Sequence, residues 1–128
     1  MERRRISSAM ALEQTFGYSR AVVAGDRVFV SGTAPVMPDG SDPPPNAYAQ
    51  ARRCLEIIFA ALAEAGATPE DVVRTRLYLT RPQDIDAVGR AHGEAFAETK
   101  PATTGIVVAG LFDPRWLVEI EAEAIIAP

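Results

Sequence analysis

The feature that most constrains the fold of this 128-residue chain is the side-chain alternation in its last strand-like segment, residues 116 to 126. Three carboxylates occupy alternate positions there: Glu119, Glu121 and Glu123. The residues between them are apolar, so a strand here buries one face and carries a row of acids on the other. Residues 100 to 111 are rich in β-branched and apolar residues and predict a second strand, with a turn between the two at residues 110 to 114.

The rest of the pattern predicts two helices and three more strands. An apolar stripe at helical spacing begins after Asn46, which can cap a helix, and continues to about Ala65 before Gly66. The second helix is predicted from a Thr80 cap to about Thr99. The additional strands are predicted at residues 19 to 23, 27 to 31 and 72 to 79. This order predicts a single α+β domain, residues 1–128, with a mixed sheet of four to six strands and both helices on one face.

The sheet face without helices is predicted to be polar. Arg74, Arg76 and Tyr78 share one face of their strand, as the three glutamates do on theirs. Cross-strand Arg–Glu pairs would explain that arrangement structurally. A glutamate at the mouth of a cleft, with a raised pKa, could instead act as a general acid or base. An uncovered sheet face must be solvated or closed by another subunit, so we expect a homo-oligomer.

Two further segments have both a structural and a functional interpretation. Residues 33 to 45 contain five prolines and form a predicted loop, equally consistent with a ligand-binding flap and with plain surface. In the second helix, Gly89 and Gly93 lie one turn apart beside His92. Two glycines cost a helix roughly 1 kcal/mol each relative to alanine, which suggests close approach by another element or a ligand.

Composition excludes several classes of function. A net charge of −4 argues against a nucleic-acid-binding surface. The chain has neither a recognisable signal peptide nor an apolar stretch of membrane-spanning length, and we expect a cytoplasmic protein without membrane contact. Its one cysteine, Cys54, lies on the apolar helix stripe and is interpreted as a small buried hydrophobe. We expect no metal site, because His92 is the only histidine and alternate glutamates point in parallel.

Several motifs, in order and spacing, resemble the RidA/YjgF/L-PSP (Rid) family over nearly the whole chain. They are Gly17-Tyr18-Ser19-Arg20-Ala21, Val28-Phe29-Val30-Ser31-Gly32, Gln50-Ala51, Asp71-Val72-Val73, Pro101-Ala102 and Val118-Glu119-Ile120-Glu121-Ala122. The resemblance implies a chorismate-mutase-like α+β fold and a homotrimer whose sheets form a central barrel. It also implies small-molecule clefts between subunits and, in the best-known members, cofactor-independent hydrolysis of enamines and imines such as 2-aminoacrylate.

The resemblance also implies roles for individual residues. Tyr18 matches the tyrosine that lines the family's pocket, and Glu119 matches the water-positioning glutamate, with Glu121 as the alternative. Thr103 stands where the family places a carboxylate-binding arginine, and a threonine cannot supply that charged, bidentate grip. Arg20 or Arg90 could reach the cleft instead, although each is interpreted first as a surface residue.

The candidate catalytic residue is therefore Glu119, and the candidate substrate-binding residues are Tyr18, Ser31, Gly89, His92 and Thr103. The leading hypothesis is a Rid-like hydrolase of an imine, enamine or related small carbonyl compound that lacks the usual carboxylate. The alternative is a non-catalytic, ligand-binding or stress-protective trimer, favoured by the missing arginine. An endoribonuclease ranks last, because the chain is acidic and has no histidine pair.

Overall fold

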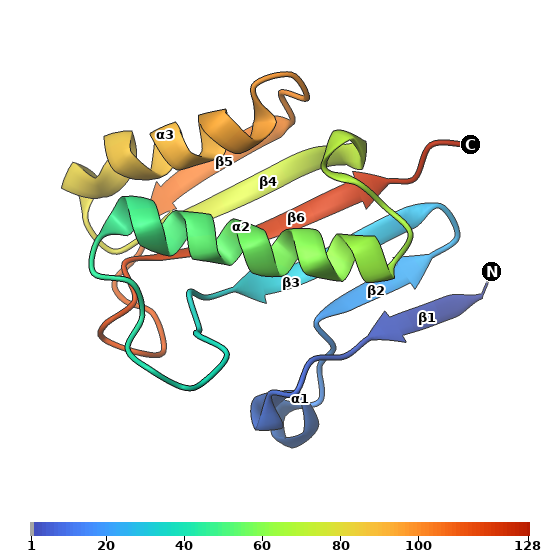
Figure 1. Ribbon diagram of the computed structural model, residues 1–128, viewed down its shortest axis with the longest axis horizontal. Coiled ribbons are helices and arrows are strands. Elements are labelled where there is room, and N and C mark those ends of the chain that lie inside the picture. Colours follow the sequence, from blue (N-terminus) through green and yellow to red (C-terminus); the bar gives the residue numbers. More distant parts are fainter. Residues whose placement is uncertain (1) are drawn as a thin grey trace.

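The computed structural model describes residues 2–128, which form a six-stranded sheet with two long helices across one face (Figure 1). The strands are β1 (Arg3–Ile6), β2 (Ala21–Ala24), β3 (Arg27–Thr33), β4 (Val72–Leu79), β5 (Ala102–Val107) and β6 (Val118–Ile125). The α-helices are α1 (Ala11–Phe16), α2 (Ala47–Glu64) and α3 (Ile85–Phe96). The strand order is β1-β2-β3-β6-β4-β5, and only the β4–β5 pair is parallel. The predicted mixed sheet with both predicted helices on one face is confirmed.

Strand β6 lies inside the sheet, between β3 and β4, and its alternation is as predicted. Val118, Ile120, Ala122 and Ala124 are at most 2% exposed, whereas the glutamates between them remain partly exposed. Both C-terminal strands are shorter than predicted. β6 starts at Val118, two residues later than predicted, and β5 stops at Val107, before the predicted end at residue 111.

Two N-terminal elements were not predicted. Strand β1 pairs antiparallel with β2, and its sequence of three arginines and one isoleucine has no apolar alternation. Helix α1 has six residues, and the side chain of its N-cap residue, Met10, makes no capping hydrogen bond. Gly17 ends the helix in the left-handed conformation, at a φ of 75°, which glycine adopts without strain. Elements this short carry too little periodicity to be recognised.

Strand β4 contains the one irregularity that changes a predicted face. The predicted alternation, with Arg74, Arg76 and Tyr78 on the polar face, places Val73 on the opposite, buried face with Thr75, but Val73 is 43% exposed, and its neighbour Val72 is buried instead. The pairing of β4 with β6 shifts in register between Val72 and Arg74. An extra residue at such a bulge reverses the facing of the side chains before it.

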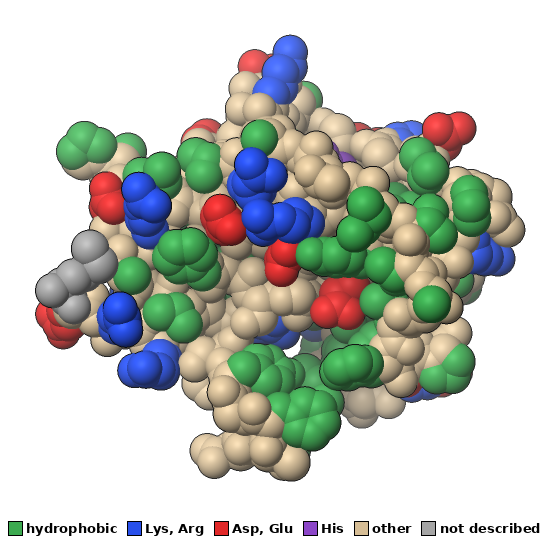
Figure 2. Space-filling view, turned by 180° about the vertical axis from the view of Figure 1, so that it is seen from behind, with side chains coloured by type: hydrophobic (Ala, Val, Ile, Leu, Met, Phe, Trp, Pro, Cys, Tyr) green, Lys and Arg blue, Asp and Glu red, His purple; other side chains and the backbone are tan. Residues whose placement is uncertain are grey.

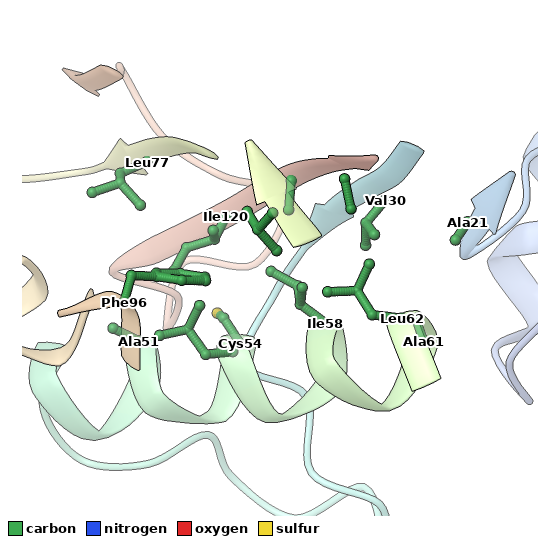
Figure 3. Packing of buried hydrophobic residues seen from close by; sticks show 14 of the residues in the cluster. Ala21, Val30, Ala51, Cys54, Ile58, Ala61, Leu62, Leu77, Phe96 and Ile120 are labelled. Atoms are coloured by element: carbon green, nitrogen blue, oxygen red, sulfur yellow. The ribbon is translucent and has the colours of Figure 1, made fainter. Parts of the chain in front are cut away.

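Helix α2 supplies most of the layer above the sheet. The Asn46 side chain caps it by accepting a hydrogen bond from the Ala49 backbone N–H at 2.8 Å, as predicted. Figure 3 shows Cys54, Ile58 and Leu62 of this helix directed towards Val30 and Ile120 of the sheet. Cys54 is fully buried, and burial raises the pKa of its thiol, which fits the interpretation as a core residue.

Helix α3 begins later than predicted. Thr80 does not cap it, because a 3-10 turn (Pro82–Asp84) comes first, where the Arg81 guanidinium donates two hydrogen bonds of 2.8 Å to Asp84. Helical spacing places Ile85 on the same apolar stripe as Val88 and Phe96, but as the first residue of α3 it is 54% exposed, whereas those two are buried. Within residues 2–128, no helix combines the length and apolar character needed to cross a membrane.

We expect Ile58→Ala to lower the free energy of unfolding by about 2–5 kcal/mol, because it leaves a cavity between α2 and the sheet. Ile85→Ala is the matched control and should change it by about 0.5 kcal/mol or less, because that side chain is largely solvated. Urea denaturation of the two variants measures both values. Equal losses would contradict this description of the core.

Candidate functional site

A cavity of about 680 Å³ opens at the edge where α1, the loop after β3 and the start of β6 meet. Figure 2 shows the hollow in the lower part of the sheet side, bordered by hydrophobic side chains. Three of the predicted site residues line it: Tyr18, Ser31 and Glu119. The loop over residues 33 to 45 also contributes, through Ala34, Val36, Met37, Pro38 and Gly40. Of the two interpretations of that loop, its position favours a ligand-binding segment.

Glu119 is the one glutamate among the residues that line this cavity. Its carboxylate lies in the space that a Cβ atom on Gly32 would fill, so glycine at position 32 makes room for it. Within residues 2–128, no hydrogen bond or ion pair holds the carboxylate. Burial raises the pKa of Glu119, the Arg20 charge opposes the rise, and the Glu121 charge adds to it. A carboxyl group with a raised pKa and free oxygens can exchange protons with a bound molecule.

Ser31 and Tyr18 are the other two predicted site residues that line the cavity. The Ser31 hydroxyl donates a hydrogen bond to the Ser19 carbonyl at 2.7 Å, and the Ser31 N–H donates to the Arg20 carbonyl at 3.0 Å. Tyr18 follows directly on the turn that ends α1 and is 37% exposed. The site thus holds a fixed hydroxyl and an accessible phenol near the carboxylate.

Arg20 is a cavity residue that the sequence interpretation placed on the surface, and that placement was wrong. It is only 7% exposed and lines the cavity. Its Nη2 donates to the Gly32 carbonyl at 2.6 Å, while its buried Nε has no hydrogen-bond partner in residues 2–128. Burial lowers the pKa of the guanidinium, although Tyr18, Glu13 and Glu119 counteract this. Its place two residues after Tyr18, in the same motif, was the available signal, but an arginine is expected on the surface and its burial was not predictable.

Glu121 and Glu123 have a different environment. The Tyr78 hydroxyl donates to Glu121 at 2.6 Å, and Arg76 Nη1 lies 3.3 Å from Glu121 and 3.2 Å from Glu123. The hydrogen bond to Glu121 raises the pKa of Tyr78. Predicted Arg–Glu pairing is therefore confirmed for Arg76. Because Glu119 lines the cavity and Glu121 is paired on the open sheet face, the geometry favours Glu119 as the functional carboxylate.

The remaining candidates lie elsewhere in the chain, around β5 and α3. The Thr75 hydroxyl is 2.8 Å from both the His92 Nε2 atom and the Thr103 hydroxyl. Burial lowers the pKa of His92, which favours the neutral imidazole. In a single chain this cluster does not border the cavity that contains Glu119. Thr103 itself is exposed, on the free edge strand β5.

The expectation of a close approach at the α3 glycines finds no support within one subunit. A Cβ atom added to Gly89 or Gly93 would meet no other atom within 4 Å in the described residues. Across residues 2–128, no group of three histidine, cysteine, aspartate or glutamate side chains is arranged to hold a metal ion.

The burial of Glu119 predicts a pH-dependent cost to stability. Because its pKa is higher in the folded than in the unfolded chain, the folded protein holds the extra proton, and stability falls as pH rises through this range. Glu119→Gln removes this ionisation. We expect the difference in unfolding free energy, Glu119→Gln minus wild type, to increase as pH rises from about 4 to 7.

Urea denaturation of both proteins across this pH range measures the difference. A difference that stays constant, or shrinks towards neutral pH, would contradict the raised pKa of Glu119.

Comparison with known proteins gives matches over nearly the whole chain. The family model described as Endoribonuclease L-PSP matches residues 8–126. An uncharacterized Streptomyces coelicolor protein is 44% identical over 121 residues, covering 94% of this chain and 90% of the relative.

Two solved structures extend the similarity to three dimensions. Rv2704 of Mycobacterium tuberculosis, described as a member of the YjgF/YER057c/UK114 family, has a TM-score of 0.90 and 41% identity, covering 98% of this chain and 100% of that structure. Escherichia coli TdcF with bound serine has a TM-score of 0.82 and 28% identity, with 96% and 94% coverage. The family match, the sequence identity and the shared architecture together show that this chain belongs to the Rid/YjgF/L-PSP family.

Proposed function

We propose that this Rid-family protein hydrolyses a small, reactive imine or enamine without a cofactor, with Glu119 as the general base. The observation that carries the proposal is the half-buried Glu119 carboxyl group, which lines a ligand-sized cavity, has no hydrogen-bond or ion-pair partner in residues 2–128, and has a raised pKa. Proton transfer by a positioned carboxyl group is most effective when its pKa lies near the working pH. Ser31 and Tyr18 would position the substrate beside it.

The proposed reaction adds one water molecule across the C=N bond. Glu119 takes a proton from water as the oxygen bonds to the imine carbon, and the nitrogen takes up a proton from solvent. The resulting carbinolamine then loses its hydroxyl proton to solvent as the carbonyl forms, and the nitrogen leaves as ammonia with the proton that Glu119 held. An enamine is first protonated on carbon, which converts it to the imine, and the imine then follows the same steps. The sequence involves no change of oxidation state, so it needs only water, proton exchange with solvent and one positioned base.

We also propose the homotrimer that the family resemblance implies. All six residues of edge strand β5 are exposed, among them Ile106 at 47% and Val107 at 46%. Ile106 pairs with Tyr78 and so shares the sheet face away from the helices. Apolar side chains on an open edge favour coverage by another copy of the chain. In that arrangement Thr103, on β5, would lie beside the cavity of a neighbouring subunit.

The runner-up is a non-catalytic protein that binds small molecules. Its support is Thr103, whose hydroxyl is turned towards Thr75 and His92 and carries no charge. The bound serine in the TdcF structure supports small-molecule binding in either case. RNA cleavage, which the family model's description suggests, is less well supported, because the only histidine lies outside the cavity and the chain carries a net charge of −4.

We expect Glu119→Gln to reduce ammonia release from a panel of amino-acid-derived imines by about 10²–10⁴-fold, the usual contribution of a general base. Glu123→Gln is the matched control and should retain activity, because that residue pairs with Arg76 on the open sheet face. Coupled assay of ammonia on freshly generated imines measures both. Unchanged turnover in Glu119→Gln would remove Glu119 from the mechanism, and no turnover by the wild type would favour the binding protein.

The trimer predicts a mass in solution of about three times 13.7 kDa by sedimentation equilibrium. Ile106→Glu should shift this equilibrium towards smaller species, because it places a charge on the proposed contact face. Exposed Ile85→Glu is the control and should leave the mass unchanged. A wild-type mass of about 13.7 kDa would refute the proposed assembly.

A further inference from the structure

We propose that Gln50 is the positioning residue of the site: it lies outside the cavity, yet it fixes the segment that carries Trp116 and Glu119. The proposal rests on the proposed function for the role of Glu119. Gln50 lies near the start of α2 and is only 3% exposed, although glutamine is usually found on protein surfaces. Its burial therefore calls for an explanation in the contacts that it makes.

The Gln50 side chain joins α2 to two other segments that border the cavity. Its Nε2 donates to the Pro44 carbonyl and to the Arg115 carbonyl, each at 3.0 Å, and its Oε1 accepts from the Leu117 N–H at 2.8 Å. Both N–H donors and the oxygen of the amide are thus in use. Because Pro44 belongs to the loop over residues 33 to 45, one buried amide ties this loop and the turn before β6 to the same helix.

The two contacts with the turn before β6 bracket a residue of the cavity wall. Arg115 and Leu117 are the chain neighbours of Trp116, and the Trp116 side chain lines the cavity. Glu119 follows Leu117 by two residues and lines the same cavity. Gln50 therefore acts on the site through the backbone, without belonging to its lining.

The start of β6 depends on this support because only one neighbouring strand pairs with it. Pairing with β4 continues to Val118, whereas pairing with β3 reaches only as far as Ile120. Glu119 lies beyond that limit, beside the space at Gly32. Gln50 accepts a hydrogen bond from the backbone just before this stretch, where β3 no longer contributes.

A second contact joins the same two segments, but it is exposed to solvent. Arg115 Nη1 lies 2.9 Å from Asp42 Oδ1, and the two side chains are 53% and 91% exposed. Exposed ion pairs contribute little, because water and salt screen them. Loss of the Gln50 amide would instead leave one N–H and two carbonyls of a buried network without that partner, which is costly. Gln50, and not the ion pair, is the contact that sets this geometry.

Trp116 is the only tryptophan of the chain, so its fluorescence reports on this segment directly. Gln50→Met keeps the approximate size of the side chain and removes all three hydrogen bonds. We expect its Trp116 emission to shift to longer wavelength and to be quenched more readily by acrylamide, because the turn and the loop separate. We also expect the pKa of Glu119 to fall towards that of a solvated glutamate, because water gains access to the carboxyl group.

NMR titration of isotope-labelled glutamate carboxyl groups measures that pKa, and the Glu119 signal is the one missing from Glu119→Gln. Asp42→Asn is the matched control, because it removes the exposed contact between the same segments. It should leave the Trp116 emission and the Glu119 pKa as in the wild type. Unchanged emission and pKa in Gln50→Met would overturn the proposal.

Leu62→Ala controls for a general loss of stability. Leu62 is fully buried towards the other end of α2, so its truncation destabilises the core without touching the Gln50 contacts. It should leave both readouts as in the wild type. If Leu62→Ala changes them as much as Gln50→Met does, destabilisation alone explains the effect and the positioning role is refuted.

If Gln50→Met does not fold, Gln50→Glu decides. Its side chain has nearly the same shape, but the ionised carboxylate has no proton to donate to the Pro44 and Arg115 carbonyls. Its Trp116 emission should be shifted at neutral pH, and acidification should partly reverse the shift, because the protonated carboxyl group regains one donor. The wild type should show no such reversal. Wild-type emission from Gln50→Glu at neutral pH would contradict the proposal.

These measurements need no turnover, so they separate this proposal from the proposed function. Altered emission and pKa in Gln50→Met, without Glu119-dependent ammonia release by the wild type, would refute the hydrolase alone. Glu119-dependent ammonia release, together with an undisturbed Trp116 and Glu119 in Gln50→Met, would refute this inference alone.

Discussion

The structure depends above all on the register of β6 between β3 and β4. The pairing of Tyr78 with Glu119, and of Arg76 with Glu121, sets which side chains of β6 enter the core and which stay outside it. A slip by one residue would exchange the two faces, drive three carboxylates against α2 and expose Ile120. The hydrophobic core and the candidate site are thus specified by the same backbone hydrogen bonds. Burial of the apolar face keeps Glu119 at the cavity.

The sequence predicted those parts of the fold in which the apolar residues keep one regular spacing over many residues. The alternation of β6 and the apolar stripe of α2 correspond to the observed faces, because burial follows side-chain spacing there. Strand β1 and helix α1 carry no such period, so they were missed. Val73 was assigned to the wrong face because a bulge depends on pairing with another strand, which local sequence does not record.

The candidate site was predictable only in part, for a related reason. Tyr18, Ser31 and Glu119 were identified through motifs and do line one cavity. Arg20 belongs to one of those motifs, but an arginine in isolation is expected on the surface. In the folded chain it is buried and lines the cavity together with residues of α1 and of the loop after β3, a tertiary arrangement that local sequence does not record. The roles of His92 and Thr103 depend on how copies of the chain assemble, which a single chain does not define.

Gly32 has an evolutionary consequence, because it lies between the two ionisable groups of the cavity. Its carbonyl accepts a hydrogen bond from Arg20, and its missing side chain leaves space for Glu119. Positions 32 and 119 therefore cannot vary independently. A larger residue at 32 would be accommodated only with a shorter or displaced acid at 119. Among relatives, these two positions should change together, which makes their covariation a record of how the site has been retained or lost.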